Sequence, residues 1–178
     1  MKRPVVISLA VASLAVAGVR GQATYPYIAE LRQNYGFVKT NLLALADKMP
    51  EEHYGFKPSP DVRSFAESIA HVSDSQARSC SLVNGDPKML DAGSKTTKAD
   101  LVAKLKESFA ICDAAFEALS DAGASQMVRL GQSKFERSKL GLLAGVIGHS
   151  NEQYGYMAVY LRLKGIVPPS TEAMNQGR

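Results

Sequence analysis

Four segments of the sequence repeat their apolar residues at the spacing of an α-helix, and each is followed by a proline or glycine. Their approximate ranges are 25–49, 64–83, 97–123 and 138–164. Apolar residues at intervals of three and four lie on one face of a helix, and that face has to be buried against other helices. No segment alternates strongly enough to predict a strand, although residues 124–137 have room for a short turn or hairpin. The pattern therefore predicts an all-α four-helix bundle.

Local signals mark where these helices begin. Residues 64–67 read Ser-Phe-Ala-Glu, a capping box in which the Ser64 side chain caps the helix and Glu67 reaches back. Thr97, three residues before Asp100, predicts the start of the third helix. The buried face expected for the last helix consists of Leu142, Val146, His149, Gln153, Met157 and Tyr160.

The first 23 residues have the pattern of a secretory signal peptide. Lys2 and Arg3 precede the apolar run 5–18, and small residues at cleavage-compatible spacing follow. The run is too short to span a bilayer comfortably, which favours a cleaved signal over an uncleaved anchor. We therefore expect a periplasmic or secreted protein that has no membrane part after cleavage. Residues 24–172 are predicted to form the bundle domain, and residues 173–178 a flexible tail.

The charge balance argues against nucleic-acid binding. The whole chain carries a net charge of +4, with 21 basic and 17 acidic residues. The predicted signal peptide contains three of the basic residues and no acidic one, so the rest of the chain carries only +1. No basic stripe with interleaved aromatic residues remains, and this excludes the usual electrostatic footprint of a nucleic-acid-binding protein.

The two cysteines bear on topology. In an exported protein an even cysteine count favours a disulfide, here between Cys80 and Cys112. Both lie at similar depth in their predicted helices, so a bridge requires parallel helices. Antiparallel neighbours would separate the two residues by roughly 20 Å. With the bridge, residues 86–96 form a crossover and the bundle is up-down-down-up. The alternative is two buried free thiols that pack as small apolar side chains.

Two histidines and a glutamine are predicted to lie at the same level of the bundle. If the last helix runs antiparallel to the second, His71 lies level with residues 150–151. His149 and Gln153 are four residues apart and share one helix face. The three side chains can then converge in the core, where facing helices of bundles build metal sites.

Three stretches of the sequence have the character of a known family: YGFKPSPDVRSFAESIAHVSD, SFAICDAAFEAL and HSNEQYGYMAVYLRLKGIVPPST. On these residues the chain resembles the DinB/YfiT-like superfamily, in particular its exported members, over essentially everything after the signal peptide. The resemblance implies a four-helix bundle of up-down-down-up order that holds zinc or nickel between three histidines. It also implies metal-dependent transfer or isomerisation involving small thiols as an activity of the wider superfamily, and a homodimer as a candidate assembly.

Carried onto this sequence, the family's metal ligands fall on His71 and His149, and the third falls on Gln153. An imidazole is a good ligand for zinc or nickel, whereas an amide offers only a weak carbonyl oxygen. The resemblance therefore implies a weakened divalent-metal site. Other carboxylates that can replace the missing ligand are Glu67, Asp74 and Glu152, although capping is the simpler role for the first of them.

Further polar residues are weaker candidates. Tyr156 and Tyr160 lie on the same face as the predicted ligands and can donate hydrogen bonds to a substrate, but core aromatics with satisfied hydroxyls are the simpler interpretation. Arg162 can pair with a carboxylate or lie in solvent at the helix end. His53 is expected to be a solvated loop histidine.

Two functions stay open at this point. The first is a metal-dependent transferase or hydrolase, whose metal activates a bound water or thiol or polarises a carbonyl. The second is a non-catalytic, disulfide-stapled bundle that binds a small molecule or a protein, with His71, His149 and Gln153 in a buried hydrogen-bonded cluster. The sequence identifies neither a substrate nor a catalytic residue, and Gln153 is the residue that separates the two hypotheses.

Overall fold

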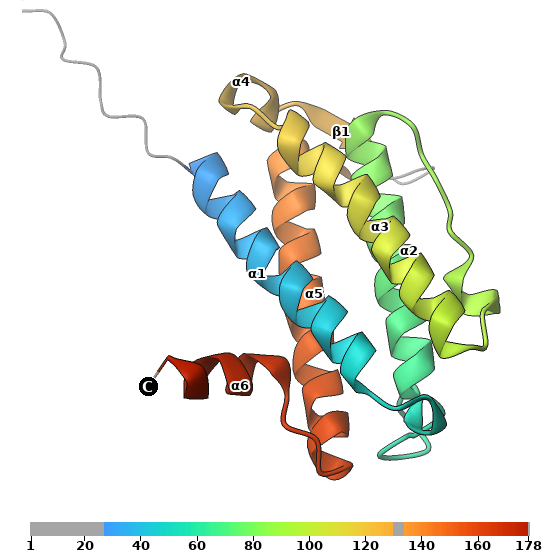
Figure 1. Cartoon of the computed structure of the whole chain (residues 1–178). Helices are drawn as coiled ribbons and strands as arrows, with labels where there is room; N and C mark the ends of the chain where they lie inside the picture. Colours follow the sequence, from blue (N-terminus) through green and yellow to red (C-terminus); the bar gives the residue numbers. More distant parts are fainter. Residues whose placement is uncertain (1–26, 130–133, 178) are drawn as a thin grey trace, which may run out of the picture.

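The structure is a computed structural model that describes residues 27–129 and 134–177, and the predicted signal peptide lies outside these residues. Four long helices lie alongside one another (Figure 1): α1 (Tyr27–Lys48), α2 (Phe65–Asn84), α3 (Lys98–Ala118) and α5 (Lys139–Leu163). The connecting and terminal segments contain η1 (Glu51–His53), η2 (Ala92–Ser94), α4 (Asp121–Ala124), β1 (Met127–Arg129), β2 (Glu136–Ser138) and α6 (Pro169–Gln176). The two short strands pair antiparallel within the segment expected to hold a turn or hairpin. The prediction of an all-α fold is confirmed.

The start of α2 is fixed by the predicted capping box. The Glu67 amide donates to Ser64 Oγ at 3.1 Å, and the Ser64 amide donates to Glu67 Oε2 at 2.6 Å. These hydrogen bonds, together with an ion pair to Lys57, lower the pKa of Glu67 to about 2. The helix ends at Gly85, whose φ of 78° is in the left-handed region that glycine adopts without strain.

A disulfide joins α2 to α3 as predicted. Cys80 and Cys112 are bonded, with their Cα atoms 4.9 Å apart. Gln76 contacts Ser108 one turn before this bridge, so the contacts advance in the same direction along both helices. The alternative of two free thiols is wrong.

The third helix is shorter than the sequence pattern predicts. It ends at Ala118 rather than continuing to Gly123, and Ser120 starts the separate helix α4. The physical reason is Arg32 of α1, whose guanidinium donates at 2.8–2.9 Å to the carbonyls of Phe116 and Glu117 at the end of α3 and to that of Leu119, the residue that follows the helix. A side chain from another helix thus satisfies carbonyl groups that a helix end leaves without partners.

The core lies between the four long helices. Large, fully buried side chains come from all four helices: Phe65, Phe109, Phe116, Leu42, Leu45, Ile69, Leu105, Leu143, Met157 and Leu161. Burying each of these contributes about 1.5–3 kcal/mol of transfer free energy. Within the described residues no helix is long and apolar enough to span a membrane.

The C-terminal residues contain a helix that the sequence analysis did not predict. Pro169 occupies the first turn of α6, a position where its missing amide proton costs nothing. The helix is held to the bundle because Tyr154 of α5 donates its hydroxyl proton to Ser170 Oγ at 2.8 Å, and Lys48 forms an ion pair with Glu172. Residues 173–176 of the expected tail are therefore helical.

Candidate functional site

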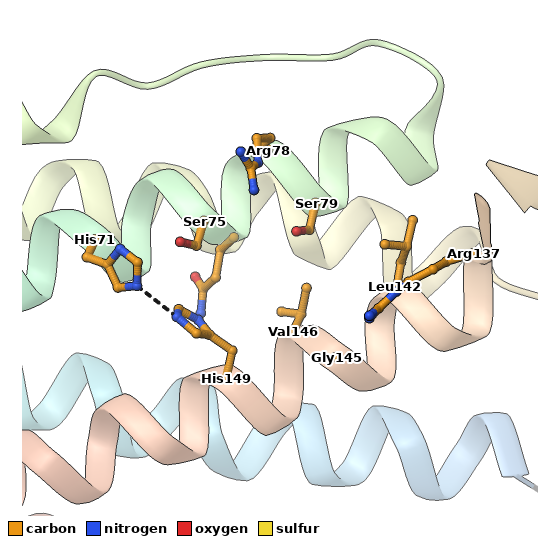
Figure 2. Close-up of a pocket in the computed structure, with 10 residues that line it drawn as sticks. His71, Ser75, Arg78, Ser79, Arg137, Leu142, Gly145, Val146 and His149 are labelled. Atoms are coloured by element: carbon orange, nitrogen blue, oxygen red, sulfur yellow. Dashed lines mark hydrogen bonds between the residues drawn. The ribbon is translucent and has the colours of Figure 1, made fainter. Parts of the chain in front are cut away.

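His71 and His149 point toward each other across the interface of α2 and α5 (Figure 2). Their Nε2 atoms lie 3.0 Å apart, and their rings meet edge to face. At this distance one Nε2 donates a proton to the lone pair of the other. Away from the histidines, Figure 2 shows Ser79, later in α2, on the same side as Leu142, earlier in α5, so the two helices run antiparallel here.

Both histidines favour the neutral form. Burial lowers the pKa of His71, and the positive charge of Arg63 lowers it further, while Asp74 and Glu152 act in the opposite direction. Burial is also the main cause that lowers the pKa of His149, against a smaller raising effect of Glu152. Neutral imidazole is the form that ligates a metal, so the environment favours ligation.

Gln153 follows His149 by one helical turn and is only 5% exposed. No side chain in the described part of the protein hydrogen-bonds to its amide. Gln153 is not among the residues that line the pocket beside His71 and His149. In residues 27–129 and 134–177, no three His, Cys, Asp or Glu side chains gather closely enough to hold a metal.

The three carboxylates considered as replacement ligands have other partners. Glu67 completes the capping box of α2. Asp74 accepts hydrogen bonds from the amides of Ala92 and Gly93, and so fastens η2 to α2. Glu152 accepts a hydrogen bond from the Tyr156 hydroxyl at 2.9 Å. Each of these contacts gives the carboxylate a structural explanation.

The other polar residues considered as candidates from the sequence have surroundings that do not involve the histidine pair. The Tyr160 hydroxyl donates to the carbonyl of Arg63 at 2.8 Å, as expected for a core tyrosine with a satisfied hydroxyl. Tyr156 is half exposed, and Arg162 donates to Thr171 Oγ1 at 3.0 Å, which connects α5 to α6. His53 lies in η1 and does not line the pocket next to the histidine pair.

A buried polar network that the sequence analysis missed lies behind the histidines. Gln76 Nε2 donates to Ser150 Oγ at 2.9 Å, and Ser108 Oγ donates to Gln76 Oε1 at 2.9 Å. All three residues are at most 1% exposed. Gln76 thus links α2 to both α3 and α5, and it fixes the lateral position of the helices that carry the histidines. Gln76 follows the apolar Ile69 by seven residues, about two helical turns, so the sequence pattern could have indicated that it lies on the buried face of α2.

A pocket of about 420 Å³ opens between α2 and α5, with the histidine pair at one end (Figure 2). Leu142 and Val146 form an apolar wall, and Arg78 and Arg137 also line the space. Small-molecule sites typically have this combination of an apolar surface and a few polar groups. Sequence reasoning missed both arginines.

The residues at the histidine pair fit a divalent metal. Tetrahedral zinc with nitrogen ligands at about 2.0–2.1 Å holds two such nitrogens roughly 3.3 Å apart, close to the observed 3.0 Å. Two imidazoles are fewer ligands than a structural zinc site contains, and they leave coordination positions for water, substrate or a further ligand. The fit is therefore to an open site of reduced affinity.

Comparison with known proteins places this site in a family. The chain is similar to a DinB-like protein from Bacillus cereus ATCC 10987, with a TM-score of 0.69, 14% identity, and coverage of 80% of this chain and 95% of the other. It is also similar to the DinB-like protein YjoA from Bacillus subtilis, with a TM-score of 0.62, 19% identity, and coverage of 76% and 92%. No curated protein matches the sequence.

The sequence itself gives the stronger evidence of kinship. Residues 35–157 match the family model of the DinB superfamily, a span that contains α2, α3 and both histidines. This agrees with the resemblance that the sequence motifs indicate. The chain belongs to the DinB superfamily.

Proposed function

We propose that this protein binds a divalent metal, zinc or nickel, through His71 and His149, with the Gln153 amide oxygen as a weak third ligand. We further propose that the site serves a metal-dependent transferase or hydrolase that acts on a small molecule in the adjacent pocket. The observation that carries the proposal is the 3.0 Å separation of two Nε2 atoms at the end of that pocket.

The proposal includes an up-down-down-up order of the four long helices and a location outside the cytoplasm. The Gln76–Ser108 hydrogen bond and the Cys80–Cys112 disulfide indicate that α2 and α3 run parallel, which supports the order. The antiparallel packing of α2 against α5 at the histidines also supports it. The disulfide supports an oxidising compartment, where such bonds persist. The N-terminal sequence pattern supports export.

A bound metal would supply Lewis-acid chemistry, by lowering the pKa of a coordinated water or polarising a carbonyl. The protein's own residues hold and orient the two imidazoles. Burial keeps both rings neutral, and the network centred on Gln76 fixes α2 against α5 behind them. The apolar wall of Leu142 and Val146 excludes water from one side of the pocket.

A second function is favoured by the same histidine pair. A direct hydrogen bond between the rings gives each Nε2 a partner without any metal. In that case the protein is a non-catalytic module that binds a small molecule in the pocket. Zinc affinity separates the two functions, since a binding module that does not use metal would show none at this site.

The test is a zinc titration of the purified protein by calorimetry, with Gln153→His and Gln153→Leu as paired variants. Loss of an outer-shell partner alone costs about 10–100-fold in metal affinity. A third imidazole should therefore tighten zinc binding by at least about tenfold, and leucine should weaken it. Equal affinity in all three proteins would show that residue 153 is not a ligand, and no zinc binding by wild type would favour the second function.

A further inference from the structure

Two basic side chains line the pocket beside the histidines, Arg137 at its far end and Arg78 on its α2 side (Figure 2). Arg78 of α2 and Arg137 of β2 both border the space, and no Asp or Glu is among the described residues that line it. Figure 2 shows Arg137 reaching toward Leu142, opposite the histidines. Its Nη1 lies close to α5, since a Cβ built on Gly145 would be 3.8 Å from it.

Neither guanidinium has a partner within the described residues. Arg32 donates to carbonyls and Arg129 pairs with Glu136, whereas no ion pair or side-chain hydrogen bond involves Arg78 or Arg137 there. Arginine is suited to bind carboxylate or phosphate because its planar donors match their oxygens. Both arginines are exposed to solvent and border the same pocket, so their guanidinium groups are accessible to an anion bound there.

The pocket has different chemistry at its two ends. Seven residues separate His71 from Arg78 on α2, and seven separate His149 from Leu142 on α5, which is roughly 10 Å along each helix. The hydroxyl of Ser75 and the apolar side chain of Val146 also border the space. A ligand that fills the pocket therefore meets the guanidinium of Arg137 at one end, polar and apolar side chains together with Arg78 along its length, and imidazoles at the other end.

We propose that the pocket binds a small, elongated organic anion whose carboxylate or phosphate group pairs with Arg78 and Arg137, while its other end reaches the histidine pair. The anion-binding half depends only on the arginines. The contact between the ligand's other end and the histidine pair rests on the proposed function, because a metal at His71 and His149 would favour a ligand with an oxygen donor there.

The experiment is calorimetric titration of octanoate, of the neutral octanamide, and of the dicarboxylate suberate. Each is added to chelator-treated protein and to protein supplied with zinc. We expect chelator-treated wild type to bind octanoate saturably and octanamide far more weakly. Arg78→Gln and Arg137→Gln should each weaken octanoate binding by about tenfold or more, as expected for the loss of a charge-assisted hydrogen bond.

Two further variants make the result specific. Lys106→Gln removes the same unit of charge from an exposed position on α3 that does not line this pocket, and it should bind octanoate as wild type does. Gly145→Leu keeps both arginines but places a side chain in the pocket, and it should abolish binding. Since leucine favours the helix over glycine, this variant should not lose stability.

The outcomes separate the two proposals. Tighter binding of suberate than octanoate only when zinc is present supports both. An arginine dependence with no suberate preference in zinc supports the anion site and counts against the metal site. Octanoate binding that is absent in wild type, or that is equal in both arginine variants and Lys106→Gln, overturns the anion site whatever the metal does.

Discussion

His71 and His149 lie 78 positions apart in the sequence, yet their Nε2 atoms are 3.0 Å apart. Two features of α2 position His71 for this contact. The capping box fixes where the helix begins, and the Gln76 side chain joins it to α3 and α5. The site therefore depends on a polar network in the core as well as on the two histidines themselves.

Breaking this network should destabilise the protein. Gln76→Leu leaves the buried Ser150 hydroxyl without its side-chain partner, whereas the Ser108 hydroxyl keeps its hydrogen bond to the Leu105 carbonyl. We therefore expect the free energy of unfolding to fall by about 1–3 kcal/mol. Urea denaturation followed by circular dichroism measures this. In the triple variant with Ser108→Ala and Ser150→Ala, no unpaired group remains and most of the loss should be recovered. A triple variant less stable than the single one would contradict this account.

The disulfide should stabilise the bundle mainly through the unfolded state. Cys80 and Cys112 are 32 residues apart, and closing a loop of this length contributes about 3–4 kcal/mol in the chain-entropy model. The Cys80→Ser, Cys112→Ser double variant should lose about this much unfolding free energy. Reductant should lower the stability of wild type to that of the variant and leave the variant unchanged. A loss below about 1 kcal/mol would mean that strain cancels the entropy gain.

Stability of the metal-free protein should fall as the pH is lowered through about 6.5, the ordinary histidine pKa. Burial lowers the pKa values of His71 and His149, so below this pH the unfolded chain binds more protons than the folded protein. The unfolding free energy therefore rises with pH across the window between the folded and unfolded pKa values. Glu67 titrates near 2 and does not contribute there.

The measurement is urea denaturation of chelator-treated protein between pH 5 and 8, compared with His149→Asn. This variant has one fewer histidine whose pKa is lowered in the folded protein, so its stability should depend less steeply on pH. An unchanged slope would show that His149 does not carry the effect. The nearby charges of Arg63, Asp74 and Glu152 are the same in both proteins and cancel in the comparison.

Features that depend on local sequence were predictable. The capping box follows from four consecutive residues, and apolar periodicity places His71 and His149 on facing helix surfaces. The even number of cysteines in a chain with a predicted signal peptide led to the disulfide, and their similar helical depth led to parallel helices. The all-α class follows from the same periodicity, because each apolar face has to be covered by another helix.

Features that depend on distant contacts were not predictable. The end of α3 at Ala118 is set by Arg32, 84 positions from the first carbonyl that it binds. Arg78 and Arg137 line the same pocket, and nothing in either local sequence indicates that they do. The helix α6 was missed because two consecutive prolines read as a stop, whereas the second of them begins a new helix.

Metal content is the most direct test of the central claim. The protein, purified without metal-binding tags or chelators, is analysed by inductively coupled plasma mass spectrometry beside His149→Ala and Lys106→Gln. We predict zinc or nickel in wild type and in Lys106→Gln, and its loss in His149→Ala. Metal that is absent from wild type even after dialysis against zinc, or that persists equally in His149→Ala, would contradict a metal site at His71 and His149.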